Sequence, residues 1–251
     1  MRTSAAMEKL WEAILFTSRV TDDPVKAWEE HNADLHDRCA YLNSLHIRSL
    51  HYTAENGTDL TVGMIPEGEW KGGGDTSLQG IFFNPNIPTE ECFISPKRGE
   101  AEGIVYASKP LSYQGQLIEN FSVRFEKGRA VEVKAEKGQD VLEQIISMDE
   151  GCHYLGECAL VPKESPIHQS GLLFYNTLFD ENAACHIAFG ASYPGTTRNG
   201  TTLSKEELLA RGMNQSSIHE DVMIGAEDSK ITGKCRDGRT VTLFENGVWV
   251  L

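Results

Sequence analysis

The sequence lacks the features of several common protein classes. No apolar run approaches the length of about 20 residues that spans a bilayer, and the N-terminal residues MRTSAAMEKLWEAI lack the apolar core of a signal peptide. Positive charge is scarce, with 23 basic against 37 acidic residues and a net charge of −14. Such a charge disfavours nucleic acid or an anionic membrane as a partner, because both are negative. We therefore expect a cytoplasmic protein that binds neither.

Cysteine is used in a way that argues against a disulfide framework. The chain has six cysteines without a CxxC pair, and its 251 residues are too many to need disulfides for stability. Hydrophobic residues make up 40% of the sequence, which is enough for a real core. We expect reduced thiols and one large domain, with or without an appendage.

Residues 1–45 predict a helical lead-in that packs on the rest of the chain. A short helix is expected over residues 7–17, and Asp23-Pro24 supplies an N-cap and a first-turn proline for a longer helix over residues 24–45. An apolar stripe runs along the longer helix, formed by Val25, Trp28, Leu35, Cys39 and Leu42. Its two histidines, His31 and His36, lie among acidic residues and are expected to face solvent.

Residues 46–251 predict a strand-rich catalytic domain. Short β-like runs such as IRSLHYTA, TDLTVGMI and GIVYAS follow one another, and the sequence around Glu126–Arg129 predicts a hairpin. Helices are few, over residues 140–147 and 204–210, the second opened by a Ser-x-x-Glu capping box. Because strands and helices do not alternate regularly, we expect a mixed α+β fold and not a doubly wound sheet.

The stretch LGECALVPKESPIHQSGLLFYNTLFDENAACHIAFGASY, from Leu155 to Tyr193, carries the strongest functional signal. It places Glu157, His186 and Tyr193 among apolar and small residues, where charged groups need a metal or another partner. Two outlying blocks add similar groups: Glu90-Glu91 in NPNIPTEECF, and His219-Glu220-Asp221 in SSIHEDVMIG. Together these three segments predict a metal centre.

The spacing of the third block indicates which of its side chains face the metal. His219 and Asp221 are two apart in a strand-like run, so both emerge on one face, whereas Glu220 points away. With them, five oxygen and nitrogen donors are available, one more than a tetrahedral zinc ion uses: Glu91, Glu157, His186, His219 and Asp221. We therefore expect two divalent ions, and this donor set suits zinc, cobalt or manganese equally.

Three cysteines adjoin these residues in the sequence, which raises the alternative of a thiolate zinc site. Cys92 follows Glu91, Cys158 follows Glu157, and Cys185 precedes His186. In an extended backbone, however, neighbouring side chains face opposite ways, so a ligand's neighbour points into the core. We interpret all three as small buried hydrophobic residues.

Four blocks of the sequence resemble the thermophilic-aminopeptidase family of metallopeptidases, of the aminopeptidase T and aminopeptidase S type. These blocks are NPNIPTEECF, KPLSYQGQLIENF, LGECALVPKESPIHQSGLLFYNTLFDENAACHIAFG and SSIHEDVMIG, and the match extends over residues 7–251. The resemblance implies a homodimeric metalloaminopeptidase with two metal ions that removes N-terminal residues from peptides with a free N-terminus.

The resemblance also implies a role for each residue of the site. Compared position by position, the resemblance implies that Tyr193 is an active-site residue. It also implies that the five donors are metal ligands: Glu91, Glu157, His186, His219 and Asp221. Glu90 is the general base by analogy with other two-metal aminopeptidases, in which a Glu beside a ligand Glu carries the proton.

One departure from the family leaves other functions open. Family members carry an additional N-terminal α/β domain, whereas this sequence begins at the helices that would follow it. The alternatives to an aminopeptidase are therefore a metal-binding but inactive fragment that serves assembly or binding, and a dinuclear hydrolase of another class such as an amidase or phosphoesterase.

Overall fold

The N-terminal residues form two helices. In the computed structural model, which describes residues 2–250, α1 covers Arg2–Thr17 and α2 covers Pro24–Leu45. Helix α1 begins earlier than the predicted start at Met7, because Ala5 and Ala6 favour the helical backbone. Helix α2 has the predicted bounds, and the side chain of Asp23 caps it by accepting from the backbone N–H of Lys26.

The contact face of α2 differs in part from the predicted stripe. Leu35, Cys39 and Leu42 are buried as expected, but Val25, in the first turn, is exposed. The prediction for His31 was wrong: its side chain is only 9% exposed, and Nε2 donates a hydrogen bond to the backbone oxygen of Thr89 at 2.7 Å. The acidic neighbours in the sequence gave no sign of this, because the burying segment is distant in the chain.

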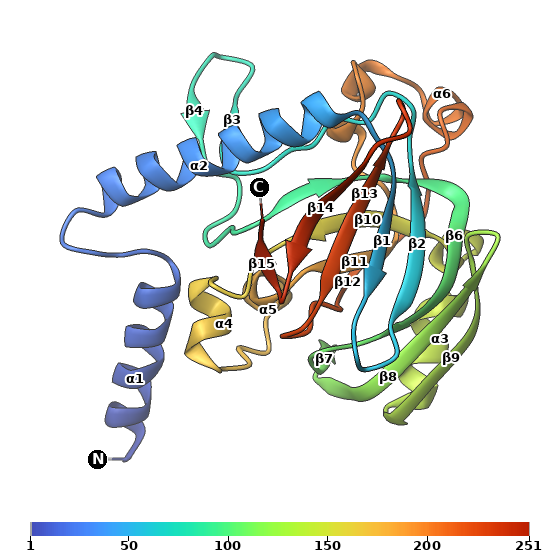
Figure 1. The fold of residues 1–251 in the computed structure, drawn as a ribbon. Helices are drawn as coiled ribbons and strands as arrows, with labels where there is room; N and C mark the ends of the chain where they lie inside the picture. Colours follow the sequence, from blue (N-terminus) through green and yellow to red (C-terminus); the bar gives the residue numbers. More distant parts are fainter. Residues whose placement is uncertain (1, 251) are drawn as a thin grey trace.

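A nine-stranded antiparallel sheet forms the larger layer. Its strand order is β15-β14-β13-β1-β2-β6-β8-β7, and β9 also pairs with β8. The strands are β1 (Ile47–Thr53), β2 (Asp59–Met64), β6 (Pro96–Tyr106), β7 (Leu111–Tyr113), β8 (Gln116–Glu126), β9 (Arg129–Lys137), β13 (Lys230–Cys235), β14 (Thr240–Glu245) and β15 (Val248–Trp249). The sheet is strongly curved, and α2 crosses one end of it (Figure 1). The predicted hairpin around Glu126–Arg129 is the β8–β9 turn.

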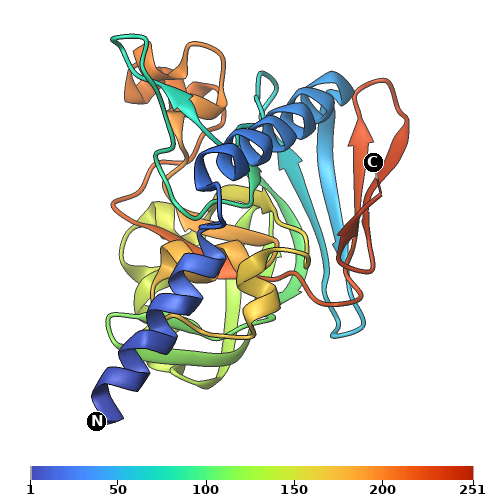
Figure 2. The ribbon, with the colours of Figure 1, turned by 90° about the vertical axis from the view of Figure 1, so that its left-hand side faces the viewer.

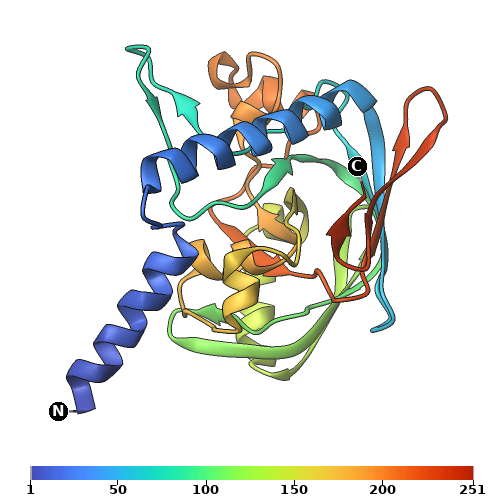
Figure 3. The same ribbon diagram turned by 60° about the vertical axis from the view of Figure 1, so that its left-hand side comes forward.

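A second, four-stranded antiparallel sheet lies inside the curve of the first (Figure 3). Its order is β12-β11-β10-β5, with β5 (Cys92–Ile94), β10 (Leu155–Leu160), β11 (His186–Gly190) and β12 (His219–Met223). The two sheets share the core; for example, Phe189 of β11 stacks on Phe125 of β8 with ring centroids 5.9 Å apart. One face of the small sheet is therefore committed to packing, and the other is free for a site.

Short helices and one hairpin complete the fold. The α-helices are α3 (Gln139–Ser147), α4 (Pro166–Ser170), α5 (Thr177–Asp180) and α6 (Lys205–Ala210), and Ser204 and Glu207 form the predicted capping box at α6. The hairpin of β3 (Asp75–Thr76) and β4 (Phe82–Phe83) projects beyond α2, and α1 extends away from the sheets (Figure 1). Helix α1 passes beside α4 (Figure 2). Within residues 2–250, no helix is long and apolar enough to cross a membrane. The α+β prediction is confirmed.

Candidate metal centre

Each strand of the small sheet brings one part of the predicted site. Glu91 directly precedes β5, Glu157 lies on β10, His186 begins β11, and His219 and Asp221 lie on β12. In the ladders, His186 lies opposite Ala159, and Ala188 lies opposite both Glu157 and Asp221. Since residues opposite one another in a sheet share a face, the strand registers place these side chains together on the face away from the large sheet.

The residues between the polar groups are small. Ala159 of β10, Ala188 of β11 and Gly190 of β11 occupy the intervening positions of this face. Their size leaves space for carboxylate and imidazole groups to reach across the sheet and approach one another.

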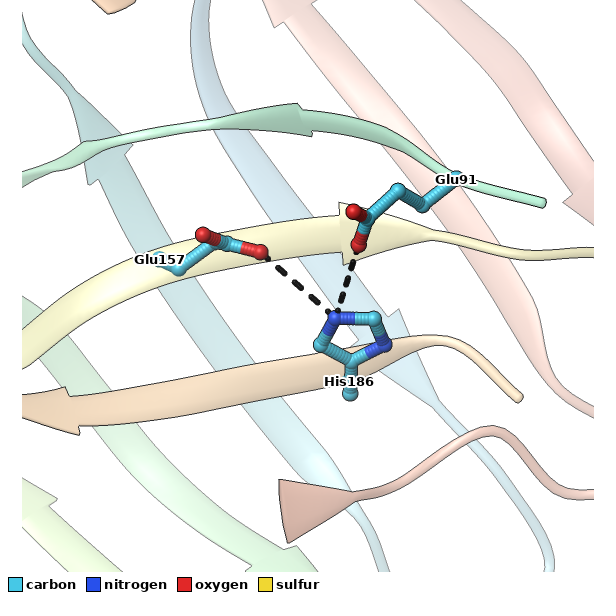
Figure 4. Close-up of side chains that lie close together, drawn as sticks. All are labelled: Glu91, Glu157 and His186. Atoms are coloured by element: carbon cyan, nitrogen blue, oxygen red, sulfur yellow. Dashed lines mark ion pairs between the residues drawn. The ribbon is translucent and has the colours of Figure 1, made fainter. Parts of the chain in front are cut away.

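A first cluster joins Glu91, Glu157 and His186 (Figure 4). Nε2 of His186 lies 3.1 Å from Oε2 of Glu91 and 3.5 Å from Oε1 of Glu157. All three side chains are buried. Their donor atoms point to a common position, as ligands of one ion would.

A second cluster joins Glu157, His219 and Asp221. Nε2 of His219 lies 3.6 Å from Oε2 of Glu157 and 3.4 Å from Oδ1 of Asp221. Glu157 therefore belongs to both clusters and presents a different oxygen to each. The two clusters are therefore joined through one carboxylate.

In both histidines, a hydrogen bond fixes Nδ1, the ring nitrogen that does not face the clusters. Nδ1 of His186 lies 3.1 Å from the backbone oxygen of Ala184, and Nδ1 of His219 lies 2.7 Å from the backbone oxygen of Ala191. A carbonyl oxygen only accepts, so each Nδ1 carries a proton, and Nε2 is the nitrogen that each ring offers to a metal. This is the usual arrangement of metal-binding histidines, whose other nitrogen donates to a carbonyl or carboxylate.

The clusters leave buried polar atoms without partners. Oε2 of Glu91, Nε2 of His186 and Oδ1 of Asp221 are buried and lack a hydrogen bond. Burial, opposed in part by His186, raises the pKa of Glu157 to about 7, with Glu91 and Asp221 adding to the rise. The like charges at this site need a cation, so the residues present fit divalent metal ions.

Glu181 is a residue of this site that sequence reasoning missed. Its side chain is buried, and burial together with the charges of Asp221 and Glu91 raises its pKa to about 10. Its position in a 3-10 helix, Glu181–Ala183, directly before the small residues that lead into β11, was the one available signal.

Tyr193 stands at the edge of the clusters. Its ring lies 4.5 Å from the ring of His219 and packs edge-on against Phe93 at 6.0 Å, measured between ring centroids. Burial, followed by the negative charges of Glu157 and Asp221, raises the pKa of its hydroxyl above the usual value. The neutral phenol can therefore donate a hydrogen bond towards the clusters.

Glu90 and Glu220 lie outside both clusters. The carboxylate of Glu90 is 4% exposed and bonds to Arg19. Glu220 pairs with Phe189 in the β11–β12 ladder and so shares the opposite face of the sheet, as its place between His219 and Asp221 predicted.

The three cysteines beside the ligands are buried and free. The Sγ of Cys92 donates to the backbone oxygen of Leu35, and that of Cys185 donates to the backbone oxygen of Val161. Burial raises the pKa of Cys158 to about 12 and that of Cys185 to about 11. Neutral thiols directed into the core fit the interpretation as small buried residues.

Comparison with known proteins gives consistent matches over the whole chain. A family model described as thermophilic metalloprotease (M29) matches residues 1–249. The chain is 48% identical to aminopeptidase AmpS of Bacillus subtilis (strain 168) over 245 residues, which are 97% of this chain and 60% of that protein. It is also 48% identical to aminopeptidase T of Thermus aquaticus over 247 residues, which are 98% of this chain and 60% of that protein.

A solved structure is similar at the level of the fold as well. Wild-type AmpT from Thermus thermophilus matches with a TM-score of 0.91 and 45% identity, covering 99% of this chain and 60% of that chain. The chain thus spans 60% of the length of the relatives that it matches.

Proposed function

The chain belongs to the thermophilic metalloprotease (M29) family, and we propose that it is the catalytic domain of a metal-dependent aminopeptidase. The observation that carries the proposal is the sharing of Glu157 between two donor clusters. The names of the relatives, aminopeptidase AmpS and aminopeptidase T, indicate the substrate class, peptides with a free N-terminus. The division into a lead-in, 1–45, and a catalytic domain, 46–251, is part of this proposal.

Two divalent ions would be held by the five residues that the sequence predicted. Glu91, Glu157 and His186 would bind one ion, and Glu157, His219 and Asp221 the other. Zinc, cobalt and manganese all suit carboxylate and imidazole donors. When bound, such ions supply Lewis-acid activation of the peptide carbonyl and of water.

The protein's own groups would orient the reactants and move the proton. The hydroxyl of Tyr193, kept neutral by its surroundings, would donate to the oxygen of the carbonyl as negative charge develops on it. Glu90 is proposed to take the proton of the attacking water and pass it to the leaving amine.

Glu181 is an acidic residue of the site that is neither a proposed metal ligand nor the proposed general base. It is not needed to complete either donor cluster, and burial keeps its side chain protonated unless a cation lies beside it. The α-ammonium group of a peptide is such a cation. We assign Glu181 to binding the free N-terminus, which would restrict the enzyme to terminal residues.

The proposal includes a homodimer in the cytoplasm. The six cysteines are free and buried, which suits a reducing compartment. Sedimentation of the protein would test the dimer.

The test of the proposed function combines metal content with hydrolysis of a leucine chromogenic amide, measured on one preparation with and without added zinc or cobalt. We expect about two ions per chain and chelator-sensitive release of leucine. Two ions without release would favour the inactive binding module, and cleavage of phosphate esters in place of the amide would favour a hydrolase of another class. Absence of bound metal would refute the ligand assignment.

A further inference from the structure

The connection between the two lead-in helices reaches the segment that carries Glu91. Arg19 lies in this connection with a left-handed backbone, φ 57°, and its N–H bonds to the backbone oxygen of Phe16. Nε1 of Trp28 donates to the backbone oxygen of Ser18 at 2.9 Å and so ties the connection to α2. The side chain of Arg19 therefore starts from a fixed position.

Arg19 forms a two-point ion pair with Glu90. Its Nε lies 2.9 Å from Oε1 of Glu90, and one terminal nitrogen lies 2.5 Å from Oε2. Arg19 is 29% exposed and Glu90 is 4% exposed. The buried carboxylate thus obtains its cation from the lead-in, in the fork geometry that only a guanidinium provides.

The main chain around Glu90 is held from two further directions. His31 of α2 donates from Nε2 to the backbone oxygen of Thr89 at 2.7 Å. The backbone N–H of Glu90 donates to Oδ1 of Asn182 at 2.7 Å. On the other side of Glu91, Cys92 begins β5 and lies opposite Leu160 of β10.

Glu91 consequently sits between a strand on one side and an anchored residue on the other. The three anchoring groups are all remote in the sequence from Thr89–Glu91: Arg19 and His31 belong to the lead-in, and Asn182 lies in the segment before β11. Because Glu91 precedes its strand, the β ladder alone does not fix its backbone. The anchor at Glu90 supplies that constraint.

We propose that Arg19 is a positioning residue for the metal centre, which through its ion pair with Glu90 holds the carboxylate of Glu91 in the first cluster. The inference rests on the proposed metal centre and adds that the lead-in is part of its construction. Loss of Arg19 weakens metal binding at the first cluster, whose ligands are Glu91, Glu157 and His186. The second cluster, with His219 and Asp221, keeps its affinity.

The experiment is a calorimetric titration of the metal-free full chain with zinc. Glu91→Ala and His219→Ala serve as references, because each removes a ligand that only one cluster uses. Glu91→Ala should abolish zinc binding at the first cluster. Arg19→Ala should lower the zinc affinity of that cluster by about 10- to 100-fold, the usual cost of removing a group that orients a ligand. Arg19→Lys should recover part of the loss, since an ammonium keeps the charge but not the fork.

Two controls separate positioning from general damage. Arg211 is 30% exposed and pairs with the exposed Glu67 at 3.1 Å, so Arg211→Ala removes a surface ion pair outside the metal centre and should bind zinc as the wild type does. If Arg19→Ala fails to fold because the buried charge of Glu90 is left unpaired, the double variant Arg19→Met with Glu90→Gln is titrated instead, since it removes both charges.

The outcomes are distinct. Selective weakening of the first event supports the inference. Equal affinities in Arg19→Ala and the wild type, or equal weakening of both events, overturn it while leaving the proposed function intact. A wild-type chain that binds no zinc overturns both.

Discussion

Glu157 and His219 meet across a strand that separates them. Oε2 of Glu157 on β10 lies 3.6 Å from Nε2 of His219 on β12, although β11 runs between the two strands. Neighbouring strands are about 4.8 Å apart, so both side chains extend over β11 to make this approach. The residue of β11 between Glu157 and Asp221 is Ala188, whose single methyl group leaves the route open.

Enlarging Ala188 should therefore destroy the metal centre without changing a ligand. In Ala188→Leu the new side chain would occupy the space over β11, and we expect loss of more than half of the bound zinc. Elemental analysis after dialysis measures this. Ile187→Val, on the opposite face of the same strand, should retain the zinc and lower the free energy of unfolding by about 1 kcal/mol. Full zinc content in Ala188→Leu would contradict the geometry.

Removing Glu157 should affect both ions, whereas removing His219 should affect one. Glu157 contributes an oxygen to each cluster, but His219 contributes only to the second. We expect Glu157→Ala to lose nearly all bound zinc and His219→Ala to lose about half. Equal losses in the two variants, measured by zinc titration, would show that Glu157 is not shared.

The metal-free protein should lose stability as the pH rises. The folded-state pKa of Glu157 is raised from 4.5 to about 7 by burial, so its protonated form stabilises the fold and this contribution is lost as the pH passes 7. Burial lowers the pKa of His219, but Asp221 and Glu157 outweigh it and raise the pKa from 6.5 to about 9. That contribution is complete below pH 6.5 and is lost as the pH passes 9.

Zinc should remove this pH dependence, because the ion replaces the protons that the site holds. The midpoint temperature of thermal unfolding would be measured with chelator and with zinc at pH 5.5, 7 and 8.5. The difference between the two midpoints should be smallest at the lowest pH. We expect the gap to widen by about 5 °C or more across the series. A constant gap would mean that these groups do not titrate with folding.

Replacing Tyr193 by Phe should slow catalysis without loss of metal. The ring contacts with Phe93 and His219 remain in the variant, and only the hydrogen bond from the hydroxyl is lost. We expect kcat to fall about 100-fold, the usual effect of removing one donor to a developing oxyanion. Tyr175→Phe, at an exposed position, is the matched control. An unchanged kcat in Tyr193→Phe would exclude this role.

Glu90→Gln should leave the metal content unchanged and remove most of the turnover. The amide oxygen of Gln still accepts a bond from Arg19, so the anchor of Glu91 is largely kept while the proton-carrying group is lost. We expect kcat to fall about 100- to 10,000-fold. Unchanged turnover would refute Glu90 as general base. Glu181→Gln, measured in parallel, should mainly raise KM.

Much of the local structure could be predicted from the sequence. The cap of α2 at Asp23, the capping box at Ser204 and the β8–β9 hairpin depend on residues within a few positions of one another. The same holds for His219 and Asp221, since the two-residue repeat of a strand puts both on one face.

The assembly of the candidate site from separate segments was predictable only in outline. The sequence pointed to three polar blocks, but it could not place β11 between Glu157 and His219 or show that Ala188 leaves room for their approach. Nor could it show that Glu90, next to the predicted ligand Glu91, pairs with Arg19 and lies outside both clusters.

The sequence by itself determined the helix caps, the hairpin turns, the α+β class and the chemical types of the proposed ligands. Only the tertiary structure decided that Glu181 belongs to the site, that His31 is buried, and that Arg19 pairs with Glu90. The reason is physical: caps and turns are stabilised by neighbours in the chain, whereas a buried charge is stabilised by whichever distant segment packs against it.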